Sequence, residues 1–243
     1  MFKNRTYRSN ANRKGLTSFQ ITVKETDLHI QAQSDLSENA VKAVLECRGY
    51  IESYIHRHPE FLTSLVPVEI LFPAPKIIMA MAKAAKKAKV GPMAAVAGAV
   101  AEFTCRKLLQ YSKEVIVENG GDISMKIDRE ITFAVFAGKS PLSMKTGIRL
   151  DNRKHPFALC TSSGTIGHSK SFGTADAASV IADSCALADA AATAIGNLIK
   201  KESDIEKAIN TGKTIRGVKG IVIIKNKTLG AWGDLELVQL KKS

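Results

Sequence analysis

The stretch LADAAATAIG, residues 187–196, is almost pure alanine and predicts a helix, because alanine is the residue that favours helix formation most. Asp189 and Thr193 interrupt it four residues apart, so both side chains project from one helical face, a turn apart. Carboxylate and hydroxyl oxygens are hard ligands that suit Mg²⁺. The pair predicts a metal site on a helix at about 184–201; an exposed pair or a local hydrogen bond is the alternative.

The segments on either side mix helices and strands without a regular alternation. Apolar and polar residues alternate through 16–35, around a turn at 25–27, and strands are also predicted in 113–138, 145–184 and 219–240. Helical periodicity occupies 37–61, 75–91 and 91–112. This order predicts an α+β fold in which mostly antiparallel sheets pack with helices. We expect a single domain over residues 1–243, and any division into two lobes would fall near residues 118–123.

Composition places the chain among ordinary globular proteins. Of its 243 residues 45% are hydrophobic and 24% charged, and no apolar run approaches the roughly 20 residues that span a bilayer. The basic start has no apolar core or cleavage site of a secretory signal, and the four cysteines are widely spaced, so we expect a cytoplasmic protein.

The net charge of +12 invites an acidic partner, but the few aromatic residues do not interleave with the basic runs as nucleic-acid binding would require.

A basic segment follows a short apolar one in the first half of the chain. VPVEILFP, residues 66–73, predicts a strand or a packed connection. The helix expected at 75–91 has an apolar face opposite Lys76, Lys83 and Lys87, a pattern that also occurs in helices lying on membranes. Because it carries alanine where such helices carry Leu, Phe or Trp, we interpret it as a packed helix with a solvated basic face and expect no membrane contact.

Three further stretches could contact a ligand. ENGGDI, residues 118–123, lets the backbone turn sharply and ends in Asp122, and the small residues around Gly98 allow close approach to a helix. CTSSGT, residues 160–165, offers hydroxyl groups at the end of a strand, and GHSKSFGT, residues 167–174, carries His168 in a loop rich in glycine and serine. Each also occurs as an ordinary turn.

The order and spacing of these motifs resemble the ApbE family, the FAD:protein FMN transferases, over roughly residues 90–200. The resemblance implies a ligand cleft between two lobes and Mg²⁺ beside the FAD pyrophosphate, with a flavin nucleotide and a protein acceptor as partners. It implies Asp189 and Thr193 as metal ligands and His168 as the catalytic residue. The cofactor-binding residues that it implies are Asn119, Gly120, Gly121, Asp122, Ser162, Ser163, Gly164 and Gly98.

The chain also departs from the family pattern. Ala97 stands where the family helix has a lysine, the P-R-T-G motif after the histidine is missing, and so is the lipoprotein signal. Two hypotheses follow. The chain is a Mg²⁺-dependent transferase that splits FAD and transfers FMN, or it is a non-catalytic accessory protein in sulfur assimilation and homocysteine formation, with Cys160 near the same pocket. The oligomeric state stays open, a homodimer included.

Overall fold

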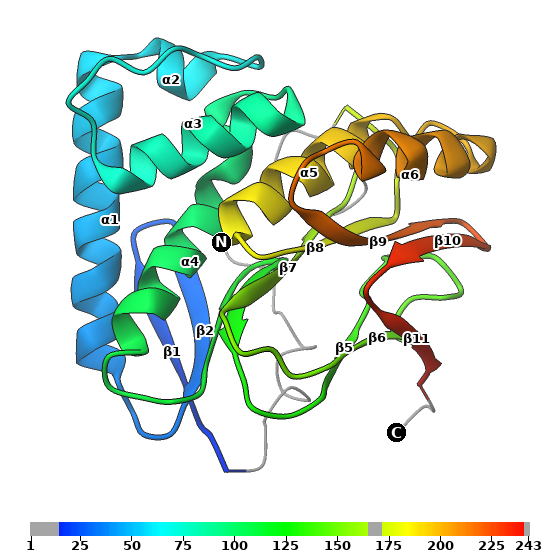
Figure 1. Cartoon of the computed structure of the whole chain (residues 1–243), viewed down its shortest axis with the longest axis horizontal. Helices are drawn as coiled ribbons and strands as arrows, with labels where there is room; N and C mark the ends of the chain where they lie inside the picture. The colour runs from blue at the N-terminus through cyan, green and yellow to red at the C-terminus, as the bar shows by residue number, and fades with distance from the viewer. Residues whose placement is uncertain (1–14, 165–171, 241–243) are drawn as a thin grey trace.

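Residues 15–164 and 172–240 are described by a computed structural model (Figure 1). The helices are α1 (Ser37–Arg57), α2 (Glu60–Thr63), α3 (Lys76–Ala88), α4 (Val96–Leu108), α5 (Cys185–Asn197) and α6 (Ile205–Lys213), with 3₁₀ turns η2 (Pro92–Ala95) and η3 (Glu202–Asp204). The strands are β1 (Thr17–Val23), β2 (Thr26–Ala32), β3 (Val115–Asn119), β4 (Asp122–Lys126), β5 (Ile131–Ala134), β6 (Thr146–Leu150), β7 (Phe157–Ser162), β8 (Ala177–Ala182), β9 (Val218–Lys225), β10 (Thr228–Gly233) and β11 (Glu236–Gln239).

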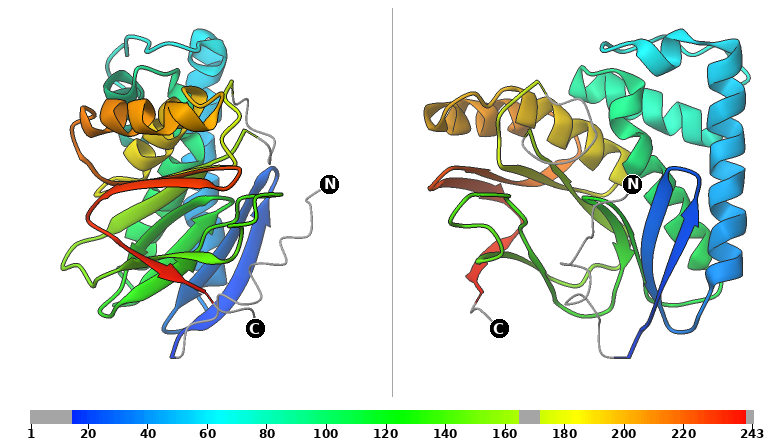
Figure 2. Two further views of the ribbon diagram at one scale, coloured as in Figure 1. Left: turned by 90° about the vertical axis from the view of Figure 1, so that its right-hand side faces the viewer. Right: turned by 180° about the vertical axis from the view of Figure 1, so that it is seen from behind.

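The strands form two antiparallel sheets. The large sheet has the order β1-β2-β3-β4-β7-β8-β9-β10, and the small one has the order β11-β6-β5. The helices lie along one face of the large sheet and the small sheet lies on the other side, as Figure 2 shows. The expected α+β fold with antiparallel sheets and packed helices is therefore confirmed.

The central strands of the large sheet are buried on both faces. In β7, Ala158 and Cys160 face the helices, while Phe157 and Leu159 face the small sheet. The same alternation runs through β3 and β9, because successive side chains of a strand point to opposite faces. The fold thus has one core on each side of the large sheet.

The turn at residues 120–121 joins two neighbouring strands in the interior of the large sheet. β3 and β4 pair from Asn119 opposite Asp122 to Val115 opposite Lys126, so the strands on both sides of this turn belong to one sheet. The division of the chain into two lobes near residues 118–123, with a ligand cleft between them, stays a prediction.

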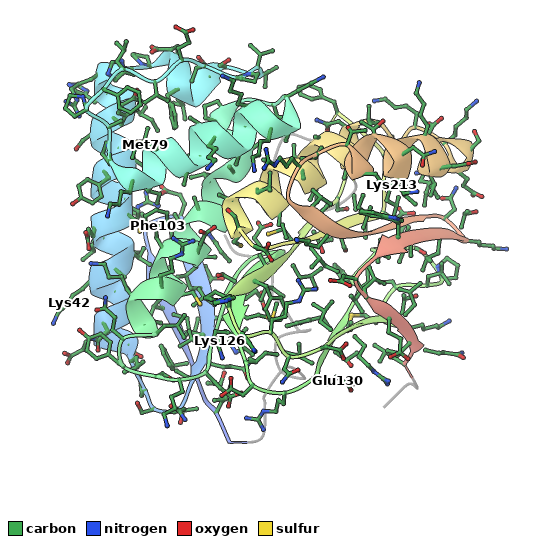
Figure 3. All side chains as sticks on the ribbon, viewed as in Figure 1. Lys42, Met79, Phe103, Lys126, Glu130 and Lys213 are labelled. Carbon is green, nitrogen blue, oxygen red and sulfur yellow. The ribbon has the colours of Figure 1, made fainter. Side chains whose placement is uncertain are left out.

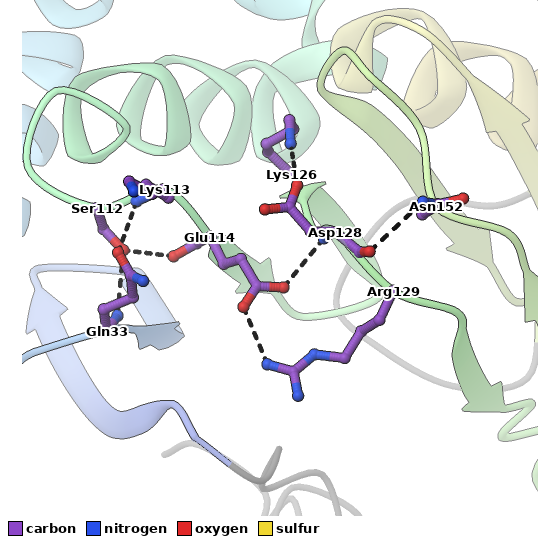
Figure 4. A network of polar contacts seen from close by, with 8 residues as sticks. All are labelled: Gln33, Ser112, Lys113, Glu114, Lys126, Asp128, Arg129 and Asn152. Carbon is purple, nitrogen blue, oxygen red and sulfur yellow. Dashed lines mark hydrogen bonds and ion pairs between the residues drawn. The ribbon is translucent and has the colours of Figure 1, made fainter.

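Polar contacts join the segments that follow β2, precede β3 and follow β4 (Figure 4). The Glu114 carboxylate accepts hydrogen bonds from the backbone N–H of Asp128 at 3.0 Å and from the guanidinium of Arg129 at 2.9 Å. The side chain of Gln33 accepts a bond of 2.9 Å from the N–H of Lys113. These contacts hold the segment before β3 against the one after β4.

The segment between α2 and α3 is a packed connection and contains no strand. Val68 and Ile70 pack against the core, whereas Leu71 and Phe72 are 64% and 78% exposed. Among the described helices, none is long and apolar enough to cross a membrane.

Candidate functional site

Helix α5 carries both predicted metal ligands and a glycine on one face. Asp189, Thr193 and Gly196 are spaced by four and three residues, so they form a stripe about 10 Å long at 1.5 Å per residue. Most of the other residues of α5 are buried alanines and apolar side chains that pack on β7 and β8 and against α3 and α4. The helix therefore holds this stripe in a fixed position.

Asp189 contacts the first turn of α4. Its Oδ2 accepts a hydrogen bond of 2.8 Å from the backbone N–H of Gly98, and the N–H of Ala97 also donates to the carboxylate. These amides lie at a helix N-terminus, where backbone N–H groups have no partner within their own helix. Asp189 thus has a structural role as a cap of α4, whatever else it binds.

Gly98 is needed for this contact. A Cβ atom at Gly98 would lie 2.4 Å from the carbonyl oxygen of Cys185 and 2.7 Å from the Cβ of Asp189. The close approach expected at Gly98 is therefore made by α5 itself.

A second carboxyl group raises the pKa of Asp189. Asp122, buried at the start of β4, is near enough for its charge to act on Asp189. Burial and, after it, this like charge raise the pKa of Asp189 well above its ordinary value, against the two hydrogen bonds from α4. A cation placed here would favour the charged form.

The β3–β4 turn reaches the same place. The side-chain amide of Asn119 donates a bond of 3.1 Å to the carbonyl oxygen of Ala97, next to the amides that Asp189 caps. Gly120 has φ of 72°, which favours glycine, and a Cβ at Gly121 would lie 2.5 Å from the carbonyl oxygen of Thr161. The small size of Gly121 therefore serves the pairing of β4 with β7.

The end of β7 lies at the other end of the stripe. A Cβ at Gly196 would lie 3.7 Å from the Oγ of Ser162. Gly164 donates its N–H to the carbonyl of Ala175 at 2.9 Å, and a Cβ on it would come within 2.2 Å of the Gly173 carbonyl oxygen. A Cβ on Gly173 would in turn lie 1.8 Å from the carbonyl oxygen of Gly196, so three glycine backbones stack here.

The structure thus brings the predicted residues to two neighbouring places. Asn119, Asp122 and Gly98 gather at Asp189, whereas Ser162 and Gly164 gather at Gly196, with Thr193 between them on α5. Ser163 lies between Ser162 and Gly164 and is half-buried. His168, the predicted catalytic residue, lies outside the described residues.

The oxygen donors fit a magnesium ion that also binds a phosphate. The hydroxyl of Thr193 has no hydrogen-bond partner within residues 15–164 and 172–240, and Asp189 forms no ion pair there. No group of three His, Cys, Asp or Glu side chains arranged for a metal occurs in that part of the chain. Mg²⁺ does not need one, because it keeps several waters and binds through one or two carboxylates plus substrate phosphates.

Sequence reasoning missed Glu102, which joins α4 to α5. This buried carboxylate accepts hydrogen bonds from the Ser184 hydroxyl at 2.9 Å and from the N–H groups of Cys185 and Ala186 at 2.7 and 3.2 Å. Gly98, Glu102 and Cys105 are spaced by four and three residues, so the one charged residue on the small-residue face of α4 was the available signal.

The thiols of Cys160 and Cys185 are buried in an environment that disfavours the thiolate. The Sγ atoms of Cys160 and Cys185 lie 3.4 Å apart, and both residues are buried. Burial raises the pKa of Cys185 to about 11 and the pKa of Cys160 well above its ordinary value. Because the thiolate is the nucleophile, this environment disfavours chemistry at Cys160.

A shallow hollow lies elsewhere, on the outer side of α6, and shares none of the predicted residues. It is lined by Ser203, Glu206, Lys207, Asn210, Thr211 and Thr214.

Comparisons with known proteins agree on one family. The family model described as AbpE bacteria matches residues 8–236. A UPF0280 protein of Methanococcus aeolicus is 39% identical over 222 residues, which are 89% of this chain and 90% of that protein. A UPF0280 protein of Archaeoglobus fulgidus is 41% identical over 233 residues, covering 93% and 95%.

Solved structures share the fold at low sequence identity. The flavinyl transferase ApbE of Pseudomonas stutzeri matches with a TM-score of 0.55 and 11% identity, over 90% of this chain and 94% of that one. The flavin transferase ApbE of Vibrio cholerae matches with a TM-score of 0.56 and 10% identity, over 90% and 97%. The ApbE protein of Thermotoga maritima matches with a TM-score of 0.56 and 13% identity, over 88% and 96%.

Proposed function

Because the chain belongs to the AbpE family and matches UPF0280 proteins over most of its length, we propose that it binds a flavin dinucleotide together with Mg²⁺. Two solved proteins of the same fold are named flavin transferases, which supports a flavin as the ligand. The observation that carries the proposal is the placement of Asp189 and Thr193, one turn apart on α5, with a second carboxyl group close to the first.

The proposed metal site uses oxygen atoms that the described part of the chain leaves available. One oxygen of Asp189 accepts the Gly98 amide, and the remaining lone pairs of the carboxylate would bind the ion. Thr193 would contribute its hydroxyl one turn further along the helix. The bound Mg²⁺ would neutralise charge on the pyrophosphate of the dinucleotide, which favours cleavage of the phosphoanhydride.

The other predicted residues would surround that ion. Glycines at 121 and 164, both exposed, and the half-buried Ser162 and Ser163 would contact the nucleotide through backbone and hydroxyl groups. We propose FMN transfer to a protein acceptor as the reaction. The acceptor group would give its proton to His168 and form a bond to the FMN phosphate, while the phosphoanhydride of FAD breaks and AMP leaves. The alternative is binding without turnover, as expected of an accessory protein of sulfur assimilation. An assay of AMP release distinguishes this alternative from the transferase.

Thermal unfolding of the full chain tests the binding site. We expect FAD with Mg²⁺ to raise the melting temperature, because a ligand that binds only the folded state stabilises it, and FAD with a chelator to raise it less. Thr193→Val keeps the shape, removes the hydroxyl and should reduce the Mg²⁺-dependent part of the shift. The matched variant Thr211→Val changes a helical threonine in the α6 hollow and should not.

Other results would contradict the proposal. No shift with FAD, FMN, ATP or AMP would exclude the flavin site, and loss of the shift in Thr211→Val alone would move binding to α6. Release of AMP from FAD distinguishes the two functions: AMP formation that requires Mg²⁺ and Asp189 supports the transferase, and a Mg²⁺-dependent shift without AMP supports the accessory protein.

A further inference from the structure

The connection between α2 and α3 exposes an unusual number of large apolar side chains. Four of them are more than 60% exposed: Leu65, Val66, Leu71 and Phe72. Leu62, on the preceding helix α2, is 50% exposed. Single exposed apolar residues are ordinary, but a group on one short segment marks an interaction site. We call these five residues the apolar ridge.

Helix α3 adds a basic stripe beside the apolar ridge. Lys76, Met79, Lys83 and Lys86 are exposed and spaced by three, four and three residues, so they share one face of the helix. Figure 3 shows Met79 on this helix. Within the described part of the chain, none of the three lysines forms an ion pair.

The ridge and the stripe belong to one region of the surface. The connection ends at Pro75, directly before Lys76, and in Figures 1 and 2 it lies beside α3 at the same end of the molecule. At its other end, Ser64 and Leu65 lie against Gly91, just after α3, where an added Cβ would come within 1.8 Å of the Ser64 carbonyl oxygen. The connection is thus held at both ends of this helix.

The charge of this region favours one kind of partner over another. Residues 56–89 hold six lysines or arginines against two acidic residues. A symmetric contact with a second copy of the chain would bring these like charges together, which opposes dimerisation through this face. Apolar side chains that project beside lysines instead match an anionic lipid surface, where the apolar groups enter the acyl boundary and the lysines meet the headgroups.

We propose that the apolar ridge and the basic stripe of α3 form a site that binds anionic membrane surfaces. The sequence alone pointed away from this, because the apolar groups are in the connection and not on the basic helix. The site is separate from the residues around Asp189, so it does not depend on the proposed flavin binding.

Vesicle sedimentation of the full chain tests the proposal with three paired variants. Leu71→Ser with Phe72→Ser removes the most exposed part of the ridge, and Lys83→Glu with Lys86→Glu reverses charge on the stripe. The control, Lys42→Glu with Lys139→Glu, makes the same charge change at exposed positions elsewhere; Figure 3 shows Lys42 on α1. All six positions are exposed, and melting temperatures check that each variant folds.

We expect the natural sequence to sediment with vesicles of phosphatidylcholine and phosphatidylglycerol and not with phosphatidylcholine alone. The ridge and stripe variants should each bind at least about tenfold more weakly, and the control should bind as the natural sequence does. A second readout starts from Trp232→Phe, which removes the single tryptophan. When Phe72→Trp is added to this variant, the emission of the new tryptophan should shift to the blue with acidic vesicles. This readout reports insertion even if the serine variant fails to fold.

Three results would overturn the proposal. The first is no sedimentation with acidic vesicles, and the second is an equal loss in the control and stripe variants, which would mean unspecific attraction of a basic protein. The third is a concentration-dependent dimer in sedimentation velocity that the ridge variant abolishes, because the ridge would then be covered by a second copy.

Discussion

The backbone N–H of Gly98 on α4 donates a hydrogen bond of 2.8 Å to the carboxylate of Asp189 on α5. The two residues are 91 positions apart in the sequence, and the bond exists because Gly98 has no side chain to keep the helices apart. Asp189 therefore links the packing of α4 against α5 to the proposed metal site.

Replacing Asp189 separates these two roles. Asp189→Asn keeps an oxygen that can accept the Gly98 bond, so at acidic pH, where the folded protein keeps the Asp189 proton, we expect a change in unfolding free energy within about 1 kcal/mol. Asp189→Ala removes the acceptor and should cost about 1–3 kcal/mol. Both variants should lose the Mg²⁺-dependent stabilisation by FAD. Urea unfolding and thermal shifts measure the two effects, and a full Mg²⁺ response in Asp189→Asn would exclude Asp189 as a ligand.

The raised pKa of Asp189 makes stability depend on pH. The folded protein keeps this proton at pH values where the unfolded chain, with a pKa near 3.8, has lost it. The contribution of Asp189 to stability therefore falls as the pH rises from 3.8 to the raised folded pKa, and stays constant above it. We expect Asp189→Asn to gain stability relative to the natural sequence across this window, as urea unfolding at stepped pH would measure. A difference that does not vary with pH would contradict the raised pKa.

Gly98→Ala should destabilise the protein although alanine favours helices. The added Cβ would meet the Cys185 carbonyl oxygen at 2.4 Å, so α4 and α5 must separate, at a cost of about 1–3 kcal/mol. Gly49→Ala in α1 is the matched control: nothing lies within 4 Å of its Cβ, and it should stabilise by about 0.5–1 kcal/mol. Denaturant midpoints of the two variants should move in opposite directions.

Glu102→Ala should be among the most damaging single changes in α4. It leaves the N–H groups of Cys185 and Ala186 without their acceptor inside the protein, which we expect to cost about 2–4 kcal/mol. Arg106→Ala removes only the 59% exposed ion-pair partner of Glu102 and should cost about 1 kcal/mol or less. Equal losses in chemical denaturation would show that the ion pair, and not the cap of α5, is what Glu102 provides.

The sequence predicted the kind of fold better than its arrangement. Alternation and helical periodicity identify the β1–β2 hairpin, the four longer helices α1, α3, α4 and α5 and the antiparallel character of the sheets, because these depend on residues close in the chain. The separate small sheet could not be predicted, since it pairs β11 with β6 across about 90 residues. Its pairing is decided by the core that it shares with Phe157 and Leu159.

The candidate site, like the fold, could be predicted from the sequence only in part. Asp189 and Thr193 could be paired from their helical spacing alone, and the resemblance supplied the other motifs. The contact of Asp189 with Gly98, and the charge of Asp122 beside it, are tertiary and leave no local pattern. Glu102 was missed because a glutamate on a helix is normally solvated, and only the packed α5 shows that this one is buried.

The double burial of the central strands restricts how this scaffold can evolve. In β3, β4, β7, β8 and β9, every charged residue lies within two positions of a strand end. Substitutions inside the strands must preserve volume and polarity on two faces at once, whereas the strand ends and the turns after them are free to exchange functional groups. Relatives with different ligands should therefore differ in sequence at the strand ends and turns, while the strand interiors stay apolar. New activities can then arise without a new fold.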